Sequence, residues 1–258
     1  MKIDRNLFIN ALAVFVLTHL ITQMLHESAH AVTAFFAGAG PILYHNHVES
    51  AVEVSDFKRI LIAAAGPLYS FFQFLICFLI MRRIKTSAMV NLFWTWMMLW
   101  GYIGFFGYIM MTPFFKYGDT GFVAVQLGVS DTGRFLIGAV GMAAFFFISA
   151  IGFKPFAYLW RSGEKRTFYN HLILYPLFVG VPINTIIDLP VPTFLSLLAP
   201  LCMPWCVMMV YGKLLSKKDL VPESQNGSVD LNEIAVKWYI FLLVVFLVNR
   251  FLIFGVNL

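Results

Sequence analysis

Long apolar runs separated by short polar segments extend along the whole chain. A helix that crosses a bilayer needs about 20 mostly apolar residues, and runs of this kind lie at 6–37, 57–81, 92–114, 133–153, 168–187, 193–215 and 236–257. The pattern predicts an all-α integral membrane protein with about seven transmembrane helices. Prolines interrupt the fifth and sixth runs, where we expect kinks or re-entrant segments: Pro176, Pro182, Pro200 and Pro204.

The segment between the first two runs, residues 41–56, has a different pattern. In PILYHNHVESAVEVSD, valines alternate with glutamates at close to the period of a strand. We expect a short strand or hairpin here, at the membrane surface and beside the end of the first helix. The edge of such a strand can pair with an unwound peptide, so the candidate substrate contacts are Val48, Val52 and Val54.

Composition agrees with a membrane protein and excludes nucleic-acid binding. The 258 residues are 60% hydrophobic and 12% charged, with a net charge of +5, and the mean hydropathy is +0.81. The basic residues form short clusters between the apolar runs, as in membrane loops. With seven spans and an inside N-terminus, 13 of the 18 lysines and arginines fall on the inner side. We therefore expect an inside N-terminus and a multi-pass protein of a bacterial inner (cytoplasmic) membrane.

The deep end of the first apolar run carries the motif HESAH, residues 26–30. On a helix, positions i and i+4 share a face, so the imidazoles of His26 and His30 can bind one zinc ion. Glu27 is then placed to take a proton from a water that the metal activates. Ionisable residues inside a membrane helix are costly and usually mark function. The alternative interpretation is a polar trio that only hydrogen-bonds neighbouring helices.

Zinc needs a third protein ligand, and the chain offers several. Asp119, in KYGDTGF, follows the third apolar run and lies between Gly118 and Gly121, which permit close backbone approach. We favour Asp119. The spacing alone leaves other candidates open: Asp188, Glu49, Asp56, His45 and His47.

The order of these motifs resembles that of the site-2 protease family of intramembrane zinc metalloproteases. That family has H-E-x-x-H on a membrane helix, a G-P-x-x-N type motif on the next helix, and an aspartate in an L-D-G type motif after a proline. This chain has HESAH, then AAAGPLYS at 63–70, then TPFFKYGDTG at 112–121. The resemblance covers roughly residues 6–125 and implies Asp119 as the third ligand. Ser70 stands where the family often has Asn, and Met110 where an Asn precedes the proline. The oxyanion donor is therefore unassigned, with Asn184, Thr112 and Ser70 as candidates.

The sequence predicts two units and one principal function. Residues 1–130 form a catalytic membrane core of three helices, and residues 131–258 add helices of unknown role. The expected activity is zinc-dependent cleavage of a peptide bond in a transmembrane or membrane-associated protein substrate. The alternatives are a metal-binding membrane protein without hydrolysis, and a zinc hydrolase of lipids or small amides. The charge bias places the site near the outer leaflet, whereas the family resemblance implies the cytoplasmic side. The oligomeric state is not indicated.

Overall fold

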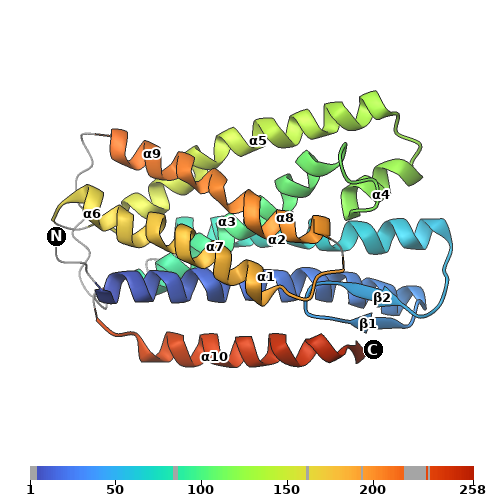
Figure 1. Ribbon diagram of the computed structural model, residues 1–258. Helices are drawn as coiled ribbons and strands as arrows, with labels where there is room; N and C mark the ends of the chain where they lie inside the picture. Colours follow the sequence, from blue (N-terminus) through green and yellow to red (C-terminus); the bar gives the residue numbers. More distant parts are fainter. Residues whose placement is uncertain (1–4, 84–86, 161–162, 193, 218–230, 232) are drawn as a thin grey trace.

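The computed structural model describes residues 5–83, 87–160, 163–192, 194–217, 231 and 233–258. In this part of the chain, long helices lie side by side in a bundle with a small sheet at one end (Figure 1). The elements in chain order are α1 (Arg5–Ala37), β1 (Pro41–Leu43), β2 (Val48–Ser50), α2 (Asp56–Arg83), α3 (Ala88–Met111), α4 (Asp119–Gln126), α5 (Asp131–Ala157), α6 (Lys165–Tyr169), the π-helix η1 (Asn170–Leu174), α7 (Tyr175–Ile187), α8 (Phe194–Cys202), the 3-10 helix η2 (Met203–Val207), α9 (Met208–Ser216), α10 (Val236–Phe251), the 3-10 turn η3 (Leu252–Phe254) and β3 (Val256–Asn257).

Six helical segments within the described residues are long and apolar enough to cross a membrane. They are α1, α2, α3, α5, the continuous run α6–η1–α7, and α10 with η3. The sixth expected span, 193–215, is not among these helices, and the irregularity expected from its prolines is confirmed. Pro200 and Pro204 lie inside that run, and because proline lacks a backbone N–H, the run divides into α8, η2 and α9. These three pieces still follow one another along the bundle (Figure 1).

The last apolar run ends earlier than the expected 236–257. Helix α10 stops at Phe251 and is followed by η3. Gly255 then adopts a φ of 74°, a left-handed conformation that glycine tolerates. The chain turns there, so Val256 and Asn257 form a strand instead of continuing the helix.

Helices α1 and α3 form the centre of the bundle. Phe15 of α1 and Trp96 of α3 are both fully buried, and their rings meet edge to face with centroids 4.7 Å apart. The ring of Trp96 also packs against that of Phe156 of α5, with centroids 5.5 Å apart, so both halves of the chain contribute to one apolar core. The more peripheral helices expose large apolar side chains, as Phe146 of α5 and Leu247 of α10 do. Such extensive exposed apolar surface is rare on soluble monomers and is compatible with a bilayer around the bundle.

The expected strand segment is a hairpin with a third strand added from the C-terminus. β1 pairs with β2 in antiparallel register, Ile42 opposite Glu49, and β3 pairs with the other side of β1, Ile42 opposite Asn257. β2 is shorter than the alternation of 41–56 suggested, and Val52 and Val54 lie beyond its end. The open edge of the hairpin therefore belongs to Val48–Ser50.

Candidate metal centre

Three of the predicted site residues meet at one point of the bundle. The Nε2 atoms of His26 and His30 are 3.2 Å apart, and Oδ2 of Asp119 lies 3.2 Å from the first and 3.3 Å from the second. Among the described residues, these form the group of histidine, cysteine and acidic side chains that could hold a metal ion. Ligand atoms bound at about 2.0–2.1 Å to a tetrahedral ion lie about 3.3–3.4 Å from one another. The observed spacing therefore fits a zinc-sized ion with three protein ligands.

The two histidine rings are held by contacts on their other nitrogens. Nδ1 of His30 donates a hydrogen bond to the backbone oxygen of Ile62 at 2.6 Å, and Nδ1 of His26 is 3.0 Å from Oγ of Ser70. A carbonyl can only accept, so in neutral His30 the proton is on Nδ1 and the Nε2 lone pair points at the cluster. Contacts of this kind fix the tautomer and orientation of metal-binding histidines. The cluster thus directs the Nε2 lone pair of His30 and the carboxylate of Asp119 toward one point, an arrangement that a cation can bridge.

Gly66 lets helix α2 pack directly against the two imidazoles. A Cβ atom at this position would lie 2.2 Å from Nε2 of His30 and 2.4 Å from Nε2 of His26. Both distances are far below van der Waals contact, and the backbone of α2 and the buried rings leave little room for adjustment. The glycine of the Gly66-Pro67 pair is thus a requirement of the cluster.

We expect Gly66→Ala to lose bound metal and to lower thermal stability, because the added methyl group occupies the space where the histidine nitrogens converge. Gly212→Ala is the matched control, since a Cβ at Gly212 of α9 meets nothing within 4 Å. That control should gain up to about 1 kcal/mol from the better helix propensity of alanine. Zinc content and thermal unfolding of the purified proteins measure both effects. Full zinc occupancy in Gly66→Ala would contradict this account of the centre.

Asp119 is brought to the histidines by the turn between α3 and α4. Oγ1 of Thr120 donates to the backbone oxygen of Tyr108 at 2.6 Å, and Oγ1 of Thr112 contacts Oγ1 of Thr120 at 2.9 Å. A Cβ at Gly121 would lie 1.7 Å from the backbone oxygen of Phe115, so this position requires glycine. Gly118, by contrast, has a φ of −79°, which any residue can adopt.

The carboxyl group of Asp119 is stabilised in its charged form. Burial alone would raise its pKa, but the neighbouring His30 and His26 hold the pKa of Asp119 well below its usual value. An ionised carboxylate is the form that binds a cation.

Tyr108 of α3 is part of the centre, although no motif in the sequence marks it. Its ring stacks on that of His26, with centroids 5.2 Å apart and planes 13° apart. Its side chain also interacts with the carboxyl group of Asp119. Tyr108 therefore contacts two of the three candidate ligands. One tyrosine among 10 in the chain carries no local motif that would have identified it.

Glu27 lies beside this cluster and is buried, with 8% of its surface exposed. Its carboxyl group interacts electrostatically with His30, His26 and Asp119. Glu27 is adjacent to His26 on α1 and is not one of the three converging ligands. A carboxyl group in this position is available to exchange a proton with a molecule bound at the cluster.

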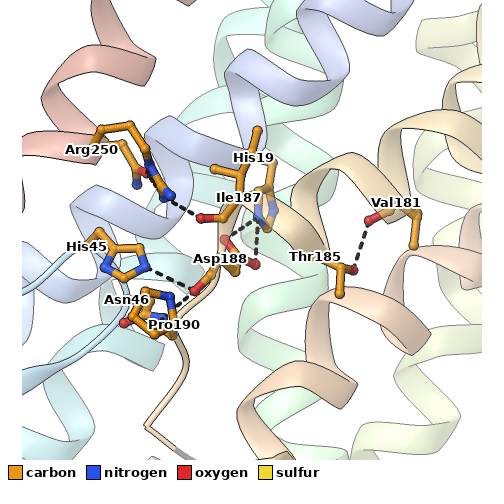
Figure 2. Close-up of polar contacts among 10 residues, drawn as sticks. His19, His45, Asn46, Val181, Thr185, Ile187, Asp188, Pro190 and Arg250 are labelled. Carbon is orange, nitrogen blue, oxygen red and sulfur yellow. Dashed lines mark hydrogen bonds and ion pairs between the residues drawn. The ribbon is translucent and has the colours of Figure 1, made fainter. Parts of the chain in front are cut away.

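The other candidate ligands have partners elsewhere. Asp188, at the end of α7, contacts Nε2 of His19 with both carboxylate oxygens, at 3.3 and 3.2 Å, and both residues are buried (Figure 2). Nε2 of His45 and Nδ2 of Asn46 bond the backbone oxygen of Asp188 at 3.0 and 2.7 Å, and Arg250 of α10 donates to the backbone oxygen of Ile187 (Figure 2). This second polar cluster attaches the hairpin to α1, α7 and α10.

The remaining candidates lie on the surface near the hairpin. Glu49 and His47 face each other at 3.6 Å, and the Glu49 side chain is more than half exposed. Asp56 begins α2 and pairs with Arg59 at 3.6 Å, where both side chains are exposed. Neither carboxylate belongs to the group formed by His26, His30 and Asp119.

The three candidate oxyanion donors lie in different surroundings. Ser70 contacts Nδ1 of His26, on the side of the ring opposite Nε2. Thr112 is bonded to Thr120. Asn184 is buried on α7, one turn before Asp188 and its contacts with His19. The oxyanion donor therefore stays unassigned.

The predicted substrate contacts differ in their exposure. Val48 of β2 is partly buried against a small apolar group that includes Leu43, whereas Val52 is more than half exposed. The backbone N–H of Val52 bonds the oxygen of Ala39 at 2.9 Å, which ties the segment after β2 to the end of α1. Val54 lies in the loop that leads to α2.

Comparison of the chain with protein-family models, curated proteins and solved structures finds no match.

Proposed function

We propose that this protein is a zinc-dependent peptidase of the membrane, similar in its chemistry to site-2 proteases. The observation that carries the proposal is the convergence of His26, His30 and Asp119 to mutual distances of 3.2–3.3 Å, although Asp119 follows His30 by 89 residues in the chain. Three nitrogen and oxygen ligands with a fourth position open are the donor set typical of catalytic zinc. The buried carboxyl group of Glu27 beside them favours hydrolysis over metal storage.

Each residue of the centre has a chemical role in this proposal. A bound zinc ion would supply Lewis acidity and make water a nucleophile at neutral pH. Glu27 accepts the proton of the attacking water and passes it to the departing amine. Ile62 and Ser70 orient the two imidazoles, and Tyr108 packs on His26. The chain thus holds the ligands rigidly and leaves one carboxyl group for proton transfer.

The substrate in this proposal is a segment of a membrane protein. A helix hides its carbonyl groups in backbone hydrogen bonds, so the segment must unwind before attack. The open edge of β2 belongs to the hairpin that lies alongside the last turns of α1, at the same end of the bundle as α4 (Figure 1). An extended peptide can add to such an edge through main-chain hydrogen bonds, with Val48 and Val52 as neighbours.

The bundle is proposed to span a bilayer with the metal centre toward the outer side. The basic residues of the described helix ends divide unequally. One end has Arg5, Arg82, Arg83, Lys154, Lys165, Arg166, Lys213, Lys217 and Lys237, and the end with the metal centre has Lys58, Arg59, Lys116, Arg134 and Arg250. The more basic end is expected to face the cytoplasm.

Single cysteines test this orientation in intact cells. In a background without Cys77, Cys202 and Cys206, Ser50→Cys on β2 should react with a membrane-impermeant thiol reagent. Ser216→Cys, at the end of α9, should react only after the cells are permeabilised. The opposite pattern would place the metal centre on the cytoplasmic side, as the family resemblance implies.

The function itself is tested by comparing the wild-type protein with Glu27→Gln, both loaded with zinc. Only the wild type should cleave peptides presented in detergent micelles or vesicles. Cleavage by the variant would contradict the proposed mechanism, and absence of cleavage by either protein would favour a metal-binding protein without hydrolysis.

A further inference from the structure

An apolar cavity of about 260 Å³ lies next to the metal centre, between α2, α3, α4 and the start of α5. Two of its lining residues directly follow residues of the metal centre in the chain. Pro67 follows Gly66, whose backbone packs on the histidines, and Thr120 follows the candidate ligand Asp119. The cavity is thus lined by residues that directly follow Gly66 and Asp119 in the chain.

The lining of the cavity selects for apolar groups. No acidic or basic side chain is among the lining residues. The two polar ones, Thr112 and Thr120, use their hydroxyl groups to bond each other and the backbone oxygen of Tyr108. A polar or charged group placed here would lose its water without gaining a partner, which is costly.

The size of the cavity limits what can enter. Pockets that enclose a whole drug-sized ligand measure roughly 300–1,000 Å³, and a helix with its side chains is about 10–12 Å wide. The cavity is too small for either but has room for one large apolar side chain. At its edge, Leu68 and Leu127 are well exposed, so it opens to the outside of the bundle.

We propose that this cavity is a specificity subsite that binds one large apolar side chain of the substrate, next to the scissile bond. The inference rests on the proposed peptidase function and adds the substrate class: an unwound segment with Leu, Met or Phe beside the cleaved bond. Val123 of α4 lines the cavity, whereas Val125, two residues later on the same helix, is exposed and does not line it. The two valines therefore offer a matched pair of substitutions.

The experiment digests a mixture of synthetic peptides, varied at the residues around the cleaved bond, with the zinc-loaded protein and identifies the cleavage sites by mass spectrometry. The wild type should prefer a large apolar residue over alanine at one position by about 10–100-fold in kcat/KM. Val123→Phe fills the cavity and should abolish this preference while still cleaving peptides with alanine there. Val123→Ala enlarges the cavity and should shift the preference toward larger side chains. Val125→Phe should behave as the wild type.

The outcomes separate this inference from the function on which it rests. If the wild-type protein cleaves no peptide, the peptidase function fails. If it cleaves peptides but shows no side-chain preference, or if zinc-loaded Val123→Phe keeps the wild-type preference, the subsite is overturned. A phospholipid that remains bound to the purified wild type but not to Val123→Phe in native mass spectrometry would assign the cavity to an acyl chain and would also overturn it.

Discussion

Glu27→Gln is expected to lower kcat/KM for peptide cleavage by roughly 10²–10⁴-fold, the usual contribution of a general base, without loss of zinc. Glutamine has nearly the shape of glutamate but cannot accept the proton of the attacking water. The three ligand atoms belong to other residues, so metal binding should persist. Peptide cleavage and elemental analysis of the same preparation measure the two properties together.

Glu164→Gln is the matched control for Glu27→Gln. Glu164 precedes α6 at the opposite end of the bundle, where it is exposed and bonds Thr167. This variant should retain both zinc and activity. If Glu27→Gln cleaves peptides at the wild-type rate, Glu27 is not the general base. A zinc-loaded, inactive Glu27→Gln protein is also expected to retain bound substrate, so cross-linking in cells followed by mass spectrometry should identify the natural substrate.

Asp119→Ala is expected to reduce zinc from about one ion per chain to a small fraction of that value. The substitution removes the one carboxylate of the cluster and leaves two buried imidazole nitrogens 3.2 Å apart. Two neutral ligands bind zinc more weakly than a set of three that includes a negative charge. Elemental analysis of the purified protein, before and after dialysis against a weak chelator, measures the loss.

Asp188→Ala is the control for the position of the third ligand. Asp188 is buried and paired with His19, away from the metal group. Removing one partner of a buried hydrogen bond typically costs about 1–3 kcal/mol, so this variant should unfold at a lower temperature yet retain zinc. The reverse result, with zinc retained in Asp119→Ala and lost in Asp188→Ala, would move the third ligand to α7.

Features that depend on neighbouring residues could be predicted from the sequence. The backbone N–H and C=O groups of an apolar helix hydrogen-bond within that helix and need no partner from a distant segment. For this reason the bounds expected for the first span, 6–37, agree with those of α1, Arg5–Ala37. The i, i+4 spacing of His26 and His30 places both on one face of that helix. The effect of a proline on a helix also depends only on its own segment. Pro200 and Pro204 therefore indicated that the run at 193–215 would not be a regular helix.

Features that join distant segments depended on the packed structure. The sequence allowed several third ligands, and the contact of Asp119 with the histidines follows from the turn held by Thr120 and Gly121. The need for glycine at position 66 arises only because α2 packs against the histidines of α1. Strand β3 pairs with β1 although more than 200 residues separate them in the chain. Such contacts arise from shape and from the need to pair buried polar groups. The periodicity of one segment describes that segment alone, so only the tertiary structure decided which distant residues meet.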